Sequence, residues 1–333
     1  MARIYKVPTD IPLIGAIPFG LIDRGTNVIQ VRPSTSCPLN CIFCSTDAGP
    51  KSTMRSAEYI VDLDHIIEWF RTLARLKGRG VEAHIDTVGD PLTYPKIADL
   101  VHGLSSMDGV EVVSIQTHGQ LLNEMILDDL GAAGLSRINL SLDALDPVLS
   151  RDLAGTACYS SERVMEMAEY VVKDTPIDLL IAPVWVNPIN TGELDGLISW
   201  AKRIGAGKKW PPLGIQKCER HKFGRKDHRI RYISWYAFYE HLRKLGSKHG
   251  INLILKPSGF GIRKSKEIRN PYRRGEKVKV RTIGPGWLKD ETLAVDMNCT
   301  RIVTVVGKEA DQGEKLTVRL LTVKDNIMVG KPV

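Results

Sequence analysis

The 333-residue chain lacks the features that would place it in a membrane or in the secretory pathway. It has no stretch of about 18 consecutive apolar residues, the length that spans a bilayer, and no N-terminal apolar run of the signal-peptide type. Its six cysteines are too few for the disulfide framework of a small secreted protein. We therefore expect a cytoplasmic protein with no membrane partner. Apolar residues make up 43% of the chain, which is enough for a packed core and excludes wholesale disorder.

Half of the cysteines lie together in one short segment. Cys37, Cys41 and Cys44 form a C-x3-C-x2-C run just after an apolar, β-rich stretch at residues 27–32. Thiolates gathered so closely on one loop can close around a single metal centre. A four-iron cluster normally takes four thiolates, so three local ligands leave one iron open to bind another molecule.

Other interpretations of the cysteine run have less support. A zinc site needs a fourth local ligand and usually C-x2-C pairs, but no His or Cys lies between Cys44 and His65. Buried structural cysteines are common singly, whereas three at this spacing are improbable by chance. The run therefore favours an iron–sulfur cluster.

With the aromatic Phe43 before its last cysteine, the run resembles the signature of the radical S-adenosylmethionine (radical SAM) superfamily. The resemblance implies that Cys37, Cys41 and Cys44 hold a [4Fe–4S] cluster whose open iron chelates the amino and carboxylate groups of S-adenosylmethionine. An electron from a donor such as ferredoxin or flavodoxin would cleave the sulfonium and release a 5′-deoxyadenosyl radical, which abstracts hydrogen from a substrate. The cofactor supplies the difficult chemistry, and the protein orients it and excludes water.

Strand-like and helix-like segments alternate through the first two thirds of the chain. We expect strands at residues 27–32, 81–87, 110–116, 137–141, 177–186 and 213–217, and helices at 62–77, 94–104, 123–133, 161–172 and 192–204. Six strands alternating with helices indicate an α/β fold with a parallel sheet and right-handed crossovers. The superfamily resemblance implies a partial (β/α)6 barrel, with its site at the carboxyl ends of the strands.

The rest of the chain has a different composition. Short β-rich runs at 277–283, 292–296, 301–306 and 315–323, with turns between them, predict a small all-β barrel of the oligonucleotide-binding (OB) type. Residues 275–280 (Gly-Glu-Lys-Val-Lys-Val) and 323–326 (Val-Lys-Asp-Asn) resemble the TRAM domain that ends several tRNA-modifying enzymes. A generic barrel used for dimerisation or packing is the alternative.

These patterns divide the chain into four parts. We expect a lead-in punctuated by proline and glycine at residues 1–25, the radical SAM partial barrel at 26–255, a basic linker at 256–274 and the TRAM-like barrel at 275–333.

Two motifs follow predicted strands where a cofactor would lie. Gly89, Asp90 and Pro91 resemble the Gly-Gly-Glu-Pro element, which binds the methionine ammonium, although Val88 and Asp90 depart from that pattern. Ser141 and Asp143 resemble the Ser-Leu-Asp motif of the molybdenum-cofactor-type subgroup, which would face the cofactor's carboxylate and ribose. The alternatives are an ordinary turn for the first motif and a helix N-cap for the second.

Further polar residues lie at the predicted strand ends. Thr117, Asn187 and Gln216 are candidate cofactor contacts from the same rim. His118 is as compatible with a structural histidine as with a ligand.

The remaining cysteines, Cys158, Cys218 and Cys299, lie in three separate segments without a C-x2-C pair. This spacing argues against a second cluster and therefore against sulfur insertion. Some radical SAM methylases of RNA use two single cysteines instead, one methylated and one resolving. Cys218, in a basic run after the last predicted barrel strand, is the better catalytic candidate, and Cys158 is the second. A buried, inert cysteine is the alternative for each.

Positive charge is concentrated in one segment. Residues 202–281 contain 24 lysines and arginines against five aspartates and glutamates, a net charge of +19. The rest of the chain has 22 against 33, so this segment holds all of the positive excess. Such a basic face attracts polyanions, although a merely solvated surface is the alternative. The candidate RNA contacts are Lys222, Arg225, Lys226, Arg273 and Arg274.

Five aromatic residues are clustered in one part of the same basic segment, at Tyr232, Trp235, Tyr236, Phe238 and Tyr239. They can stack on unpaired bases, or they can form the buried face of a helix.

Together these features predict a radical SAM enzyme that modifies RNA, with tRNA as the leading substrate and a carbon-centred change such as C-methylation as the leading reaction. One alternative keeps the enzyme but has a small-molecule cofactor precursor or a peptide as substrate. A second is an RNA-binding protein whose cluster is structural or redox-sensing.

Overall fold

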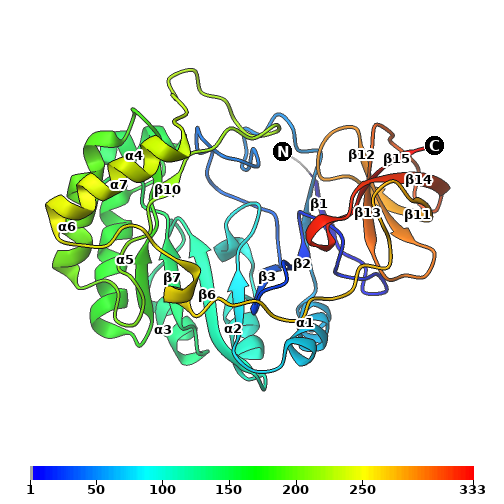
Figure 1. Cartoon of the computed structure of the whole chain (residues 1–333), viewed down its shortest axis with the longest axis horizontal. Coiled ribbons are helices and arrows are strands. Elements are labelled where there is room, and N and C mark those ends of the chain that lie inside the picture. Colours follow the sequence, from blue (N-terminus) through cyan, green and yellow to red (C-terminus); the bar gives the residue numbers. More distant parts are fainter. Residues whose placement is uncertain (1–2) are drawn as a thin grey trace.

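The computed structural model describes residues 3–333, which form an open α/β barrel and a small closed β-barrel side by side (Figure 1). Within that range, no helix is both long and apolar enough to cross a membrane.

A six-stranded sheet forms the wall of the α/β barrel. Its neighbours from β3 to β8 are all parallel, and β2 pairs antiparallel with β3 at the edge. This confirms the predicted α/β class. In spatial order the strands are β2 (Gly20–Asp23), β3 (Val28–Arg32), β5 (Val81–Ile85), β6 (Val110–Thr117), β7 (Arg137–Leu140) and β8 (Asp178–Ile181).

Helices cover the outside of this curved sheet (Figure 1). They are α1 (Leu63–Lys77), α2 (Ile97–Ser105), α3 (Glu124–Ala132), α4 (Pro147–Ala154), α5 (Ser161–Asp174), α6 (Leu194–Ile204) and α7 (Trp235–His249). Helix α1 shows how the sequence sets these elements. The Asp62 carboxylate accepts hydrogen bonds from the first-turn amides of Asp64 and His65, and the helix ends at Gly78, whose φ is 83°. Between these ends, Ile66 and Phe70 recur at helical spacing and are buried.

The sixth strand closes the barrel wall only partly. The predicted strand at 177–186 is divided into β8 and β9 (Val184–Trp185), because Pro183 between them has no N–H to donate to a neighbouring strand. Strand β10 (Gln216–Lys217) pairs in parallel with β9, and an isolated bridge joins Ile181 to Leu213. The result is the predicted partial (β/α)6 barrel, open beyond β10.

The chain ends in the predicted small barrel. Five strands close in the order β11-β12-β13-β15-β14, with one parallel pair between β13 and β15. Alternate residues of β11, such as Val278 and Val280, point into its core. The strands are β11 (Lys277–Pro285), β12 (Glu291–Asp296), β13 (Ile302–Val306), β14 (Lys315–Thr322) and β15 (Val329–Pro332).

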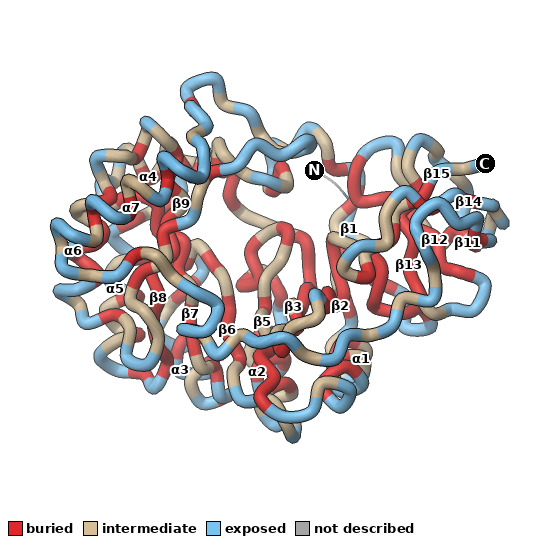
Figure 2. Tube along the Cα trace, in the orientation of Figure 1, coloured by how far each residue is buried: buried red, intermediate tan, exposed pale blue. Residues whose placement is uncertain are grey.

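The segment preceding β2 joins the two barrels. The amides of Ile302 and Met328 donate to the carbonyls of Ile14 and Gly15, at 2.8 and 2.9 Å. A Cβ on Gly15 would lie 2.0 Å from the Ile302 carbonyl oxygen, so only glycine permits this approach. Figure 2 shows buried segments continuing from the α/β barrel into the small barrel.

Several short elements have no counterpart in the predicted pattern. The lead-in contains β1 (Arg3–Lys6), which pairs with β4 (Ala57–Ile60), as well as β2. Helix α4 and strand β15 were also not predicted. Each of these strands has four residues, too few for a clear alternation of buried and exposed positions.

Candidate active site

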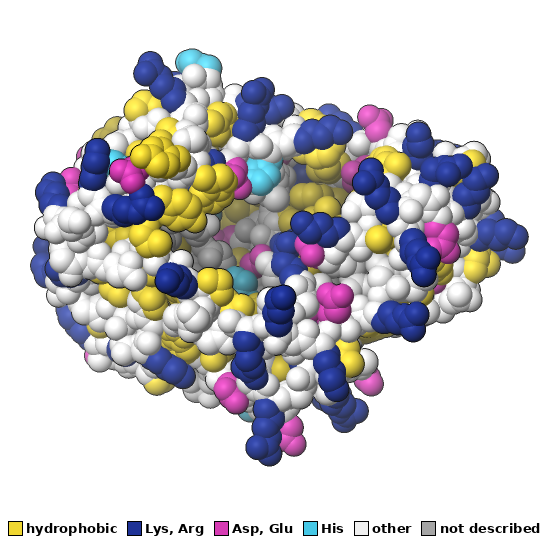
Figure 3. All heavy atoms as spheres, viewed as in Figure 1, with side chains coloured by type: hydrophobic (Ala, Val, Ile, Leu, Met, Phe, Trp, Pro, Cys, Tyr) yellow, Lys and Arg dark blue, Asp and Glu magenta, His cyan; other side chains and the backbone are white. Residues whose placement is uncertain are grey.

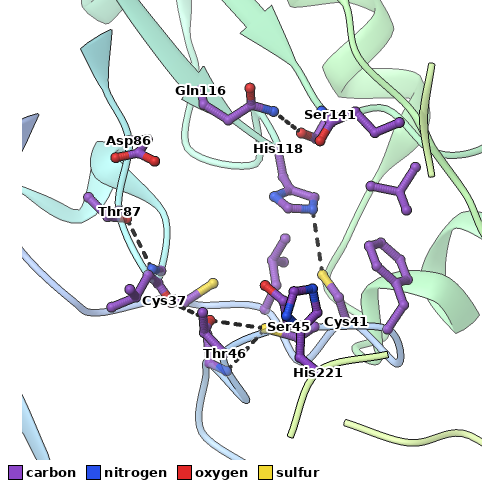
Figure 4. Close-up of a pocket in the computed structure, with 18 of the residues that line it drawn as sticks. Cys37, Cys41, Ser45, Thr46, Asp86, Thr87, Gln116, His118, Ser141 and His221 are labelled. Atoms are coloured by element: carbon purple, nitrogen blue, oxygen red, sulfur yellow. Dashed lines mark hydrogen bonds between the residues drawn. The ribbon is translucent and has the colours of Figure 1, made fainter. Parts of the chain in front are cut away.

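The cysteine run lies on the loop that follows β3, at the carboxyl ends of the barrel strands. All three of its thiols are free and line one cavity of about 460 Å³. In Figure 4 the Cys37 and Cys41 side chains reach into this cavity from one side, and Gln116, His118 and Ser141 face it from another. The remaining wall includes Val184, Gln216, Lys217 and Cys218 from the last two strands.

The cysteine thiols suit a cluster of several irons. Burial, with the charge of Asp90 as the second cause, raises the pKa of Cys37 to about 12, and burial raises the pKa of Cys41 well above its usual range. These thiols stay protonated until a metal centre displaces the protons. Within residues 3–333 no three His, Cys, Asp or Glu side chains surround a single ion. Three soft ligands that share a cavity but not one ion position fit separate irons of a cluster.

Polar groups also approach the cluster sulfurs directly. The amide of Ala48 donates to the Cys44 Sγ at 3.2 Å, and the Cys41 Sγ lies 3.6 Å from the Nε2 of His118 (Figure 4). Hydrogen bonds to thiolate ligands tune the reduction potential of a cluster. The sequence was compatible with either a structural or a functional role for His118. In the structure His118 contacts a cluster ligand.

A buried arginine ties the cysteine loop to the rest of the barrel. The Arg55 guanidinium donates to the Thr35 carbonyl at 2.7 Å and to the Thr46 carbonyl at 3.1 Å, which lie before and after the three cysteines. It also donates to the carbonyl of Val88 and forms an ion pair with Glu58 at 3.0 Å. One side chain thus holds both ends of the loop and the turn after β5.

A second arginine ties the loop from the opposite side. Arg225 forms an ion pair with Asp47 at 2.9 Å and donates to the carbonyls of Cys41, at 3.1 Å, and Ala48. Its own amide donates to the Cys44 carbonyl at 2.8 Å. Arg225 was a predicted RNA contact, and in this structure the hydrogen bonds of its guanidinium are directed to the cysteine loop.

The Asp90 carboxylate is engaged within the protein. It is buried and accepts hydrogen bonds from the Thr117 hydroxyl at 2.9 Å and from the amides of Leu92 and His118 at 3.0 and 3.1 Å. Asp90 and Thr117 therefore join the ends of β5 and β6, with Pro91 beginning the short turn that follows. Gly89 lines the cavity itself, where a Cβ would lie 2.1 Å from the Ser36 carbonyl oxygen.

Of the other predicted cofactor contacts, two line the cavity and two do not. Ser141 lines the cavity and accepts a 2.6 Å hydrogen bond from Gln116, and Gln216 lines it as well. Asp143 is buried beneath it and accepts from the Val184 amide at 2.8 Å, and burial raises its pKa to about 6. Asn187 lies outside the cavity wall and donates to the Arg231 carbonyl at 3.0 Å.

The two candidate catalytic cysteines are in different surroundings. Cys218 is buried in the cavity wall, and burial raises its pKa to about 11. Cys158 is exposed and does not line the cavity. Only Cys218 therefore faces the space that a substrate and cofactor would share.

The structure also identifies site residues that the sequence did not indicate. They are Arg55, Asp47 and the inward-facing His84, which lines the cavity floor. No motif marks these three, since each acts through a contact between segments far apart in the chain. Alternation along β5 is the one available signal, because it places His84 on the inner face.

The three thiols predict a cluster that depends on Cys41. We expect anaerobic reconstitution to give about four irons per chain. Cys41→Ala should abolish the visible absorption of the cluster and leave a soluble protein. Cys299 is exposed and lies outside the cysteine loop, so Cys299→Ala should keep the absorption. An unchanged spectrum in the Cys41 variant would contradict the assignment.

The Arg225 ion pair predicts a loss of loop stability in Arg225→Ala. Without Arg225 the Asp47 carboxylate keeps its hydrogen bonds from Ser52, Thr53 and Met54 but loses its ion pair, so we expect the free energy of unfolding to fall by about 2 kcal/mol. The cluster should also be released to a chelator faster. The neighbouring Lys226→Ala removes the same charge from an exposed position and serves as the control for urea denaturation and iron release. Equal behaviour of the two variants would show that the ion pair does not secure the loop.

Known proteins resemble the chain to different extents. It is 38% identical over 345 residues to an uncharacterized protein of Methanocaldococcus jannaschii, covering 97% of this chain and 79% of that protein. It is 35% identical over 123 residues to the GTP 3′,8-cyclase of Chlorobaculum tepidum, covering 37% of this chain and 34% of the cyclase.

In three dimensions the chain resembles Streptococcus suis SuiB, whose structure is known with its precursor peptide SuiA. The TM-score is 0.52 at 16% sequence identity, and the match covers 73% of this chain and 49% of SuiB. At this identity the likeness concerns the fold alone, and the chain spans about half of SuiB and about a third of the Chlorobaculum cyclase.

Residues 31–182 match the Radical SAM superfamily. That region begins within β3 and ends just after β8, so it includes the cysteine loop and most of the strands around the cavity. The chain therefore belongs to the radical SAM superfamily, whose members use a [4Fe–4S] cluster and S-adenosylmethionine.

Proposed function

We propose that this radical SAM enzyme modifies RNA, with tRNA as the leading substrate and a carbon atom of a nucleotide as the reacting position. The observation that carries the proposal is the exposed positive charge of residues 202–281. Of the 24 lysines and arginines in this segment, 21 are exposed, and only Arg229, Arg243 and Lys248 among these 21 form ion pairs within residues 3–333, so most of the excess is presented to solvent. A field of this kind binds the phosphate backbone of a nucleic acid.

The basic segment reaches the cavity itself. It includes β10 and the loop after it, which provide Lys217 and His221 to the cavity wall. The candidate phosphate contacts Lys222 and Lys226 lie on the same loop and are exposed, as are Arg273 and Arg274 at the start of the small barrel. A polyanion held along this surface would therefore pass the cavity opening.

Helix α7 adds an aromatic surface near that opening. Trp235 and Tyr236 are 50% and 77% exposed, while Phe238 is buried, so the buried-face interpretation holds for Phe238 and not for these two. The Lys217 Nζ lies 4.8 Å from the centre of the Trp235 ring, which links this surface to the cavity wall. Figure 3 shows hydrophobic side chains beside a hollow on this face, with lysines and arginines around it. Exposed aromatic rings in a basic setting suit the stacking of unpaired bases.

The small barrel supports the same proposal by its architecture. Closed five-stranded barrels of this kind bind oligonucleotides on many scaffolds, although the fold alone does not establish such a role. A TRAM identity for this barrel remains part of the proposal.

C-methylation is a narrower proposal with a specific geometric requirement. A two-cysteine methylation route needs both cysteines at the reacting carbon, and only Cys218 faces the cavity. Cys158 would have to reach it through movement of the segment before α5. Other carbon-centred reactions need no second cysteine.

A small molecule is the second candidate substrate. The cyclase relatives are named for GTP, and they are 25% to 35% identical to the parts of this chain that they match. The similarity to them covers 37% to 55% of this chain.

The charge distribution predicts steeply salt-dependent binding of folded tRNA. We expect the slope of log K against log salt to become shallower by about 3 when Lys222, Lys226, Arg273 and Arg274 are replaced by Ala. Each phosphate contact that is lost removes slightly less than one unit of this slope, because fewer counterions are released on binding. Filter binding or fluorescence anisotropy at several salt concentrations measures the slope.

A matched control removes four exposed charges elsewhere. Replacing Arg71, Arg75, Lys96 and Lys173 by Ala lowers the net charge equally but leaves the basic segment intact. This control should keep the wild-type slope. Weak tRNA binding that is insensitive to salt, or equal slopes in the two variants, would favour the small-molecule candidate.

A further inference from the structure

The inside of the α/β barrel contains a group of polar side chains. In closed (β/α)8 barrels the interior is packed by branched apolar side chains. Here a second cavity of about 270 Å³ lies below the first, and the two share the side chains of His84, Gln116 and Gln216. The lower cavity also has Glu82, Arg137 and Asn139 in its wall. Apolar side chains such as Leu180, Leu255 and Phe260 complete the wall, so the polar side chains form one group within a mixed lining.

Hydrogen bonds connect three of the strands across this interior. Glu82 on β5 accepts from the Arg137 guanidinium on β7 and from the Ser114 hydroxyl on β6, both at 2.6 Å. The same Oε1 atom of Glu82 accepts both bonds, and the one from Arg137 belongs to an ion pair. The single proton of the Ser114 hydroxyl is therefore used toward Glu82.

This arrangement determines the tautomer of His84. Its Nδ1 lies 2.8 Å from the Ser114 oxygen. Since the Ser114 proton points to Glu82, the Nδ1 must carry a hydrogen and donate it to Ser114. In the neutral ring the Nε2 then carries a lone pair. Within residues 3–333 no group hydrogen-bonds the Nε2, and this atom is not fully buried. It is therefore open to the cavity that His84 lines.

We propose that His84 is a catalytic base on the cavity floor, which accepts a hydrogen bond and then a proton from an N–H or O–H group of the substrate beside the reacting carbon. In the RNA substrate of the proposed function, on which this assignment of the donor rests, the group is a ring or amino N–H of the target base. The substrate N–H bond breaks, and the electron pair of that bond stays on the substrate nitrogen. The lone pair of Nε2 forms the new bond to the proton. The Ser114–Glu82 pair stabilises the imidazolium that results.

The charges around His84 are consistent with a neutral ring at neutral pH. Burial lowers the pKa of His84, and Arg137 and Arg32 lower it further, while Asp86 and Glu82 raise it. The net direction is downward. Because a base must be unprotonated, product formation should fall as the pH drops through a pKa below the usual histidine range, and should be level above it.

The first experiment follows the product nucleoside by mass spectrometry, using reconstituted enzyme and tRNA from cells that lack the protein. In His84→Asn the amide can still donate to Ser114, but nothing replaces Nε2. We expect product formation to fall about 100-fold or more, with the acid limb of the pH profile lost. His102 lies on the exposed face of α2, so His102→Asn is the control and should give the wild-type rate and pH profile. Wild-type rate and pH profile in His84→Asn would overturn the proposal.

The second experiment does not depend on RNA. Protein labelled with ¹⁵N-histidine, with its cluster oxidised, should show His84 as the Nδ1–H tautomer, and Ser114→Ala should remove that preference. An Nε2–H tautomer in the wild type would overturn the assignment whatever the substrate is. If the tautomer is as expected but no tRNA is modified, the RNA proposal fails, and His84 remains the base for another N–H or O–H substrate.

Discussion

The site depends on keeping three unlinked thiols in one cavity before any cluster is present. Burial favours the neutral forms of Cys37 and Cys41, and no disulfide holds the loop, so the restraint comes from two guanidinium groups. Arg55 binds carbonyls on both sides of the cysteines, and Arg225 binds two carbonyls within and beyond them. Arginine suits this role because its five donors form a rigid fork that is always charged.

These two arginines also connect the cluster loop to the small barrel and to the basic loop after β10. The Arg55 guanidinium lies 4.9 Å from the centre of the Trp287 ring, which belongs to the small barrel. Arg225 belongs to the basic loop after β10, whose residues form one wall of the cavity. Any displacement of the small barrel or of the basic loop would therefore act on the segment that holds the cluster.

Local patterns were sufficient for the repeating part of the fold and for the cluster ligands. The spacing of Cys37, Cys41 and Cys44 is itself a property of the local sequence, and the strands with clear turn signals were found close to their limits. Contacts between distant segments were not accessible in this way. Arg225 was predicted to bind phosphate because it lies in a run of basic residues, and its partner Asp47 is far from it in sequence. Likewise, the bonds of Asp90 to Thr117 and His118 require the register of β5 against β6, which no single motif specifies.

The most direct test asks whether the radical takes a hydrogen atom from RNA. Reconstituted enzyme would be reduced anaerobically with S-adenosylmethionine and with deuterated tRNA prepared from cells that lack the protein, and the 5′-deoxyadenosine would be analysed by mass spectrometry. The account predicts 5′-deoxyadenosine that carries deuterium from the tRNA. Cleavage of S-adenosylmethionine without deuterium transfer would contradict RNA as the substrate, and the absence of any cleavage would leave the cluster a structural or redox-sensing role.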